Sequence, residues 1–503
     1  MKRYEWVLAL TAFVVYASVI TWGIPDRTPR ERPDAWGTDE IAPGGLLEEI
    51  ANTLYFKSGV YNPKYPLMGY IIQCSLAAPY YVAVAGADTK KTRELPYFWW
   101  IGLLARLTTV ALAAALVVVA CRTYAVLFGG DGAWTAGLLV LLLPPMFYYG
   151  RTTNVDLPEL AIGSVALWQF AIILRDGLTR RTAILIGLFS ALGIATKDAL
   201  YGALVPAGLF VAVTEWRRSR RLVLLSAIVA AATYAVASGL LFNLDRYMQH
   251  LTFIRYGSTR HGAFYYGTHD PIWRVSVNAM EQLRQAMSLP LLLAAAAGCV
   301  LCIRYKPRAL YFALAAPALL VFSIWPARFV VYRFVIPMAY VLAIFAAYAL
   351  WKLPARRIAL TAVVVWLTVQ GADFSYQMRM DSRYIVRSFL EQNIRPGQTL
   401  GYYGTESNKL PFLNPAIQIV EGPKTFPALN GPDFLIVMPW QYFEIEHEDN
   451  LPEESYHKLI AGEAGYHLWF RWQTPALFQL APGRGVNPVI SVFSRQLMPS
   501  PKF

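Results

Sequence analysis

Long apolar runs, separated by short loops that often carry arginine, dominate this chain. Clear examples are Trp6–Ile24, Leu222–Leu241 and Ile358–Val369. A helix needs roughly 20 apolar residues to cross the hydrocarbon core of a bilayer, so runs of this kind are typical of membrane spans. The pattern predicts a polytopic α-helical membrane protein with about eleven spans, at roughly 5–24, 97–118, 133–149, 157–174, 182–195, 199–214, 222–242, 288–304, 309–325, 329–350 and 357–373.

One further apolar run, Leu67–Gly86, is left out of the spans. If it crossed the membrane, every later loop would change sides and the basic loops would face outward. Pro66, Gly69 and Pro79 interrupt it, and the pair Tyr80-Tyr81 is typical of a membrane interface. We expect this segment to lie at the interface or to be half inserted.

Alternate loops are rich in arginine and lysine, at 175–181, 217–221, 304–308 and 352–357. The positive-inside rule then places the N-terminus in the cytoplasm and the region after residue 373 outside. We expect the protein to lie in the plasma (inner) membrane, with its C-terminal domain in the periplasm. Residues 1–373 form the predicted membrane domain, with outer loops at 25–96 and 243–288. Residues 374–503 form a small extracytoplasmic α/β domain, with a helix that begins at Asp381 and strands at Thr399–Tyr403, Phe434–Met438, His467–Trp472 and Val489–Phe493.

The composition agrees with a membrane protein. Of 503 residues, 56% are hydrophobic and only 15% are charged, whereas a soluble domain has about 25% charged residues. The basic loops explain the net charge of +13, so it gives no reason to expect nucleic acid as a partner. No Gly-rich nucleotide loop, P-loop, zinc pattern or Gly-x-Ser-x-Gly motif is present, which disfavours a nucleotide-activated donor.

Charged residues gather at the predicted outer ends of the spans, which we call the outer mouth. Charges beside membrane spans are costly and are therefore functional candidates. Each also has a structural alternative: a solvated pair for Asp39-Glu40, a helix cap for Asp156, an internal ion pair for Lys197-Asp198 and snorkelling for Arg333. The candidates are Asp39, Glu40, Lys64, Arg151, Asp156, Lys197 and Arg333, with Arg255, His261 and Tyr265 in a basic, aromatic, Gly-rich loop. The histidines of that loop lack metal-ligand spacing, so no metal site is predicted there.

Six segments, in order, resemble GT-C-type glycosyltransferases of the protein O-mannosyltransferase and lipid A aminoarabinose transferase group. Asp39-Glu40 is similar to that group's first-loop acidic motif, and Lys64-Tyr65-Pro66-Leu67-Met68-Gly69-Tyr70 is similar to its Lys-Pro-Pro-Leu-Tyr-Tyr segment. The other four matches are Arg151 to Asp156, Ala195-Thr196-Lys197-Asp198 with Pro206, Tyr332-Arg333-Phe334-Val335-Ile336-Pro337, and Asp381–Gly401. Tyr65 and Asp198 depart from the group's proline and glycine.

The resemblance implies an inverting transfer of a sugar from a polyprenyl-phosphate donor to a lipid, glycan or protein acceptor outside the cytoplasm. Asp39 would be the general base, and Glu40 and Asp156 would position acceptor and sugar. Lys64, Lys197, Arg255 and Arg333 would stabilise the departing phosphate, while Arg151, His261 and Tyr265 would complete the donor site. Whether a divalent metal ion, Mg²⁺ or Mn²⁺, takes part is left open. Two other functions fit the same residues: transport of a lipid-linked or anionic solute, and a non-catalytic role in a membrane assembly.

Overall fold

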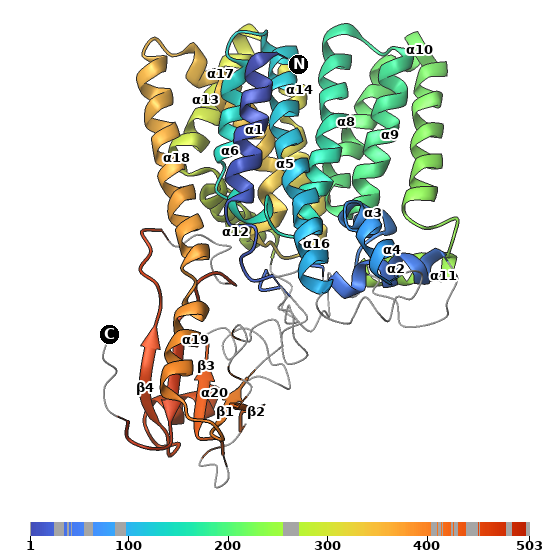
Figure 1. The fold of residues 1–503 in the computed structure, drawn as a ribbon. Helices are drawn as coiled ribbons and strands as arrows, with labels where there is room; N and C mark the ends of the chain where they lie inside the picture. The colour runs from blue at the N-terminus through green and yellow to red at the C-terminus, as the bar shows by residue number, and fades with distance from the viewer. Residues whose placement is uncertain are drawn as a thin grey trace.

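A computed structural model of the chain describes residues 2–24, 35–37, 40–41, 43–54, 64–85, 97–254, 271–403, 410, 414, 416–423, 426, 431–438, 451, 453–478 and 485–498. A bundle of long helices forms one part, and a small unit with a β-sheet lies at the end of the bundle opposite the N-terminus (Figure 1). The helices of the bundle are α1 (Arg3–Ala17), α5 (Tyr97–Phe128), α6 (Ala133–Leu142), α7 (Met146–Tyr149), α8 (Asp156–Asp176), α9 (Arg180–Thr196), α10 (Tyr201–Ala237), α13 (Leu289–Tyr305), α14 (Ala309–Ala313), α15 (Ala315–Leu319), α16 (Trp325–Ala327), α17 (Ile336–Lys352) and α18 (Arg356–Arg379).

Six helical stretches in the described part of the chain are long and apolar enough to cross a bilayer unaided. Helix α12 (Ile272–Met287) with α13 makes a seventh if this bent pair is one span. The predicted spans fall on helices, but several of these helices are short or broken. The predicted spans 199–214 and 222–242 form the two halves of α10, which meet at the non-helical residue Ser219. A mostly helical membrane protein is therefore established by length and hydropathy, whereas the count of eleven is not.

Helix α17 lies at the centre of the bundle. Almost every side chain from Ile336 to Leu350 is buried, as expected for a helix that is apolar on all sides. Helix α13 approaches it closely at Gly298, where a Cβ atom would lie 2.1 Å from the carbonyl oxygen of Phe345. Helices of this kind pack through small residues because lipid supplies no hydrophobic force between them.

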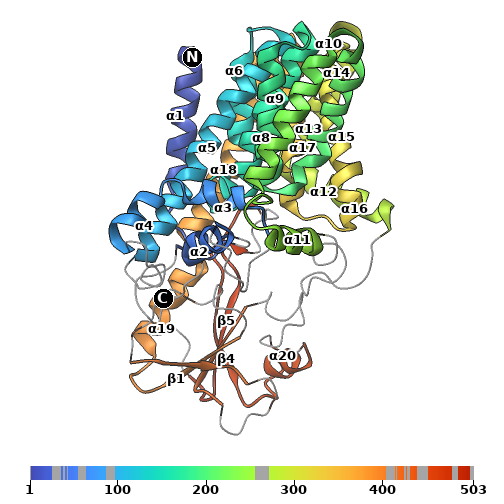
Figure 2. The same cartoon turned by 90° about the vertical axis from the view of Figure 1, so that its right-hand side faces the viewer.

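Short helices gather at the end of the bundle that faces the sheet-containing unit (Figure 2). They are α2 (Pro43–Leu54), α3 (Leu67–Cys74), α4 (Ala78–Ala85), α11 (Leu244–Thr252) and α12 (Ile272–Met287). The run Leu67–Gly86, which we left out of the spans, yields α3 and α4, of eight residues each. At 1.5 Å per residue, neither is long enough to cross a membrane.

The C-terminal unit begins where α18 gives way to α19 (Ser382–Asn393), whose N-cap is Asp381 as the sequence predicts. The predicted domain boundary at residue 373 falls within α18. The sheet has the order β2-β1-β3-β5-β4, with β1 parallel to β2 and β3, and β5 antiparallel to β3 and β4. Its elements are β1 (Thr399–Tyr402), β2 (Gln418–Glu421), β3 (Phe434–Val437), α20 (Glu453–Ile460), β4 (His467–Trp472) and β5 (Ile490–Ser494).

The C-terminal unit is attached to the bundle through buried polar contacts. The indole Nε1 of Trp22 donates to Oδ2 of Asp381 at 3.0 Å, and two nitrogens of the Arg383 guanidinium donate to the same carboxylate at 2.8 and 2.7 Å. The guanidinium also lies 3.8 Å from the ring centroid of Trp36, in a cation–π contact. The segment that leads to Asp39-Glu40 is thus held against α19.

Candidate active site

Four of the predicted site residues come together at the end of the bundle that faces the C-terminal unit. Lys197 donates to Oδ1 of Asp156, and Nε of Arg333 lies 3.9 Å from that same oxygen. The side chains of Asp156, Lys197 and Arg333 are 4%, 11% and 13% exposed. Lys64 lies close enough for the charges of Asp156 and Lys197 to act on it. We call Lys64, Asp156, Lys197 and Arg333 the charge cluster; it holds three cations around one carboxylate.

Burial and like charge perturb Lys64. Burial, followed by repulsion from Lys197, lowers the pKa of its ammonium group to about 8, while attraction from Asp156 opposes the shift. Oδ2 of Asp156 is buried and has no hydrogen-bond partner among the described residues. The charge cluster has more positive than negative groups, and one carboxylate oxygen is available to accept a hydrogen bond. It is therefore suited to bind an anion that also carries hydroxyl groups.

The charge cluster is assembled by the ends of four segments. Asp156 begins α8, and Lys197 follows the last residue of α9 with extended backbone angles. Arg333 lies in the short helix Tyr332–Val335 just before α17. Lys64 comes shortly before α3, which reaches the end of α9 because Gly69 has no side chain: a Cβ atom there would lie 2.7 Å from the carbonyl oxygen of Thr196.

Glu40 lies close in space to the loop before Asp156, and both of its carboxylate oxygens accept hydrogen bonds. The Arg106 guanidinium donates to Oε1 at 2.7 Å and to Oε2 at 3.2 Å, and the hydroxyl of Thr153 donates to Oε2 at 2.7 Å. The side chains of Glu40 and Arg106 are 2% and 1% exposed. Because Thr153 precedes Asp156 by three residues, Glu40 joins the 35–41 segment to the loop that carries Asp156.

Arg151 has a different environment from the charge cluster. It is fully buried, and its guanidinium donates to the Ser375 hydroxyl on α18 and to the Val15 carbonyl on α1, both at 3.2 Å. These contacts tie α1 and α18 to the loop before α8. The structure gives Arg151 a place in helix packing and does not bring it to the charge cluster. Asp39, Arg255, His261 and Tyr265 lie outside the described residues.

A second layer of polar residues supports the charge cluster, and the sequence reasoning missed part of it. Oε1 of Glu159 accepts from the Leu200 amide at 2.5 Å. From α11, His250 contacts Asp198 and Arg246 contacts Tyr65, the residues that follow Lys197 and Lys64. His250, Arg246 and Arg106 were not predicted as site residues from the sequence. The available signals were the two arginines, Arg106 and Arg122, inside the apolar run 99–128, and a basic pair four residues apart in a short amphipathic helix.

Within the described part of the chain, no three His, Cys, Asp or Glu side chains gather as a metal site would require. Among the described residues, no ligands are assigned to a divalent metal ion. The polar chemistry available here is that of carboxylates, lysine and arginine.

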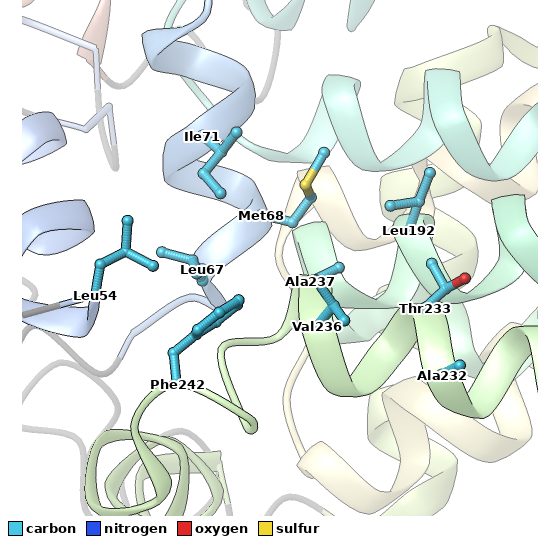
Figure 3. Close-up of a pocket in the computed structure, with 10 residues that line it drawn as sticks. All are labelled: Leu54, Leu67, Met68, Ile71, Leu192, Ala232, Thr233, Val236, Ala237 and Phe242. Carbon is cyan, nitrogen blue, oxygen red and sulfur yellow. The ribbon is translucent and has the colours of Figure 1, made fainter.

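An apolar cavity of about 590 Å³ lies in the bundle (Figure 3). Its walls come from α2, α3, α9 and α10, and α3 and α9 are also the helices beside Lys64 and Lys197. Thr233 is the one polar residue among those that line it, which are Leu54, Leu67, Met68, Ile71, Leu192, Ala232, Thr233, Val236, Ala237 and Phe242. A cationic cluster and an apolar cavity therefore share the helices α3 and α9.

The fold is similar to solved membrane glycosyltransferases. The apo crystal structure of ArnT from Cupriavidus metallidurans superposes with a TM-score of 0.49 at 13% identity, over 97% of each chain. The arabinofuranosyltransferase AftD from Mycobacteria gives 0.45 at 15% identity, over 99% of this chain and 40% of that one. The oligosaccharyltransferase of Archaeoglobus fulgidus with a tethered acceptor peptide gives 0.46 at 12%, over 96% and 74%.

No family model and no curated protein matches the sequence. The three structures are of the kind of enzyme that the sequence resembles, GT-C glycosyltransferases. Their TM-scores lie below 0.5 and their identities at or below 15%. Similarity at this level does not assign a reaction, and the reaction has to be inferred from this chain's own residues.

Proposed function

We propose that this protein is a membrane glycosyltransferase that moves a sugar from a polyprenyl-phosphate donor to an acceptor, with inversion at the sugar. One observation carries the proposal: a buried cluster of three cations and one carboxylate lies at the ends of helices, and two of these helices, α3 and α9, also line an apolar cavity. Phosphate, sugar and polyprenyl chain require these three environments, cationic, polar and apolar, side by side.

The cations would act on the phosphate. When the bond between sugar and phosphate breaks, negative charge grows on the departing phosphate, and Lys64, Lys197 and Arg333 would stabilise it. Asp156 holds Lys197 and Arg333 in place before the donor arrives. Its open oxygen Oδ2 could then accept a hydrogen bond from a sugar hydroxyl. The apolar cavity would take the first isoprene units of the lipid.

Asp39 is the proposed general base, which accepts the proton of the acceptor nucleophile as it attacks the anomeric carbon. Its neighbour Glu40 already binds Arg106 and Thr153. We therefore give Glu40 a positioning role: it fixes the Asp39 segment next to the Asp156 loop and does not itself touch the acceptor. Arg255, His261 and Tyr265, which follow α11 in the sequence, complete the proposed donor site.

The arrangement of charges supports an outward-facing site, and we propose that the protein lies in the plasma membrane with about eleven spans. Asp156 begins α8 and Arg175 lies at its other end, while Lys197 follows α9 and Arg180 begins that helix. The basic loops therefore lie at the end of the bundle away from the charge cluster. By the positive-inside rule, the basic end and the N-terminus would be cytoplasmic, and the charge cluster and C-terminal unit extracytoplasmic.

The test is a panel of radiolabelled polyprenyl-phospho-sugars incubated with purified protein in nanodiscs and with a membrane extract as acceptor source. The wild type should consume at least one donor, and Asp39→Asn should lose most of that turnover. Asp176→Asn, at the far end of α8, is the matched control and should turn over normally. If no donor is consumed, or if Asp39→Asn is fully active, the proposal is wrong; movement of an intact lipid across proteoliposomes would instead identify a transporter.

A further inference from the structure

Helix α11 presents two buried basic side chains to the rest of the protein. Arg246 and His250 are four residues apart and therefore lie on one face of the helix, and they are 1% and 0% exposed. The opposite face carries the exposed apolar residues Leu244, Met248 and Leu251. A helix with this pattern is suited to lie with its apolar face toward lipid. Helix α11 lies with α2 and α3 at the end of the bundle that faces the sheet-containing unit (Figure 2).

Arg246 holds the segment that carries Lys64. Its Nη2 donates to the carbonyl oxygen of Tyr65 at 3.0 Å, and its Nε lies 3.5 Å from Oε2 of Glu49 on α2. The guanidinium also lies 5.7 Å from the ring centroid of Tyr70 on α3. Because Tyr65 follows Lys64 directly, a shift of Arg246 would move the backbone from which the Lys64 ammonium extends.

His250 contacts the other lysine segment. Its Nε2 lies 3.1 Å from Oδ2 of Asp198, the residue that follows Lys197. Asp198 lies in the short helix Asp198–Leu200, which connects α9 to α10. One face of α11 therefore contacts the chain neighbours of both lysines in the charge cluster.

We propose that α11 is a positioning helix that sets the separation of Lys64 and Lys197 and so makes the cluster ready for a lipid phosphate. The two ammonium groups repel each other, so their backbones have to be held by other contacts. Arg246 holds one backbone and His250 the other. This inference rests on the proposed function, since it assigns α11 a role in the same donor site.

The test measures binding of polyprenyl monophosphate, with the uncharged polyprenol as reference lipid, to detergent-purified full-length protein. Arg246→Gln should weaken binding of the phosphate lipid about tenfold, the scale of one lost charge-assisted hydrogen bond, and leave polyprenol binding unchanged. His250→Gln should act in the same direction. Asp245→Asn, on the exposed face of the same helix, is the matched control and should bind as the wild type does.

A double-mutant cycle distinguishes positioning from general damage. If Arg246 acts through Lys64, then Arg246→Gln should cost little further affinity in a Lys64→Gln background, whereas independent damage would add in full. Additive losses, equal losses for both lipids, or Arg246→Gln binding like Asp245→Asn would overturn the role of α11. A wild type that does not prefer polyprenyl monophosphate over polyprenol would instead overturn the donor site itself.

Discussion

The guanidinium of Arg106 binds both carboxylate oxygens of Glu40, with Nη2 at 2.7 Å from Oε1 and Nε at 3.2 Å from Oε2. A further nitrogen of the same guanidinium donates to the carbonyl of Ile20 at 2.7 Å and to that of Trp22. Arg106 therefore fastens the end of the first helical region and the Glu40 segment to α5. Since both partners are buried, each satisfies a charge that would otherwise be costly in this environment.

We expect Arg106→Met to lower the free energy of unfolding by about 3–5 kcal/mol, because it leaves the buried Glu40 carboxylate without its partner. Thermal unfolding in detergent would measure the loss. The double variant Arg106→Met/Glu40→Gln should recover part of it, because the unpaired charge is then removed. Arg122→Gln, on the same helix, removes a longer ion pair, 3.5 Å to Glu5, from a side chain that is 36% exposed, and should cost less stability than Arg106→Met. Equal effects of Arg106→Met and Arg122→Gln would contradict the importance of this pair.

The sequence was a good guide to helices, because a bilayer admits few alternatives to an apolar helix. It was a poorer guide to the small sheet. Strand β2, Gln418–Glu421, has four exposed residues at the edge of the sheet, so it lacks the alternation of buried and exposed positions by which strands are recognised. Helix α20 was missed as well.

The charge cluster was predictable in part, because charged residues gathered at one predicted side of the membrane. The partners that organise it were not, because they are distant in sequence. Arg106 binds a residue 66 positions away, and Arg246 binds Tyr65 across 181 positions. Only the fold brings such pairs together. For the same reason Arg151, which stands close to Asp156 in sequence, turned out to contact α1 and α18 instead.

Donor binding should weaken as the pH rises through about 8, because Lys64 then loses its proton. Its pKa is lowered to about 8 from the ordinary lysine value, so the ammonium that attracts phosphate is mostly present at pH 7 and mostly absent at pH 9. If only the charged form binds, affinity for a polyprenyl-phospho-sugar should fall about tenfold between these two pH values. Equilibrium binding across this range would measure the fall.

Lys64→Arg is the matched control for that pH dependence, because arginine keeps its charge throughout the range. We expect this variant to bind with nearly constant affinity from pH 7 to pH 9. A fall of equal size in Lys64→Arg would show that some other group is responsible.

Asp156→Asn should make the lipid-free protein less stable than the wild type. Adding the phosphate lipid should stabilise this variant more than it stabilises the wild type. The substitution leaves Lys197, Arg333 and Lys64 without their shared carboxylate, and loss of one member of a buried ion pair costs about 3–5 kcal/mol. A bound phosphate would replace the missing negative charge. The rise in unfolding temperature on adding polyprenyl monophosphate should therefore be larger for Asp156→Asn than for the wild type.

The control for this variant is Asp176→Asn, which removes an exposed partner of Arg175 at the other end of the same helix. Its stability and its response to lipid should match those of the wild type within about 1 kcal/mol. If the lipid raises the unfolding temperature of Asp156→Asn by no more than it raises that of the wild type, Asp156 is not part of the phosphate site.

Gly69→Ala should weaken donor binding without touching any charged residue. The added Cβ would lie 2.7 Å from the carbonyl oxygen of Thr196, a backbone atom that cannot rotate away, so α3 has to move from the end of α9. That movement would separate the Lys64 segment from Lys197 and change the wall of the apolar cavity to which Leu67 and Met68 contribute. We expect both the phosphate lipid and polyprenol to bind more weakly, unlike the phosphate-specific loss in Arg246→Gln. Gly208→Ala, where a Cβ meets no atom within 4 Å, should bind both lipids normally, and weaker binding there would mean that helix glycines in this bundle are sensitive for reasons other than close packing.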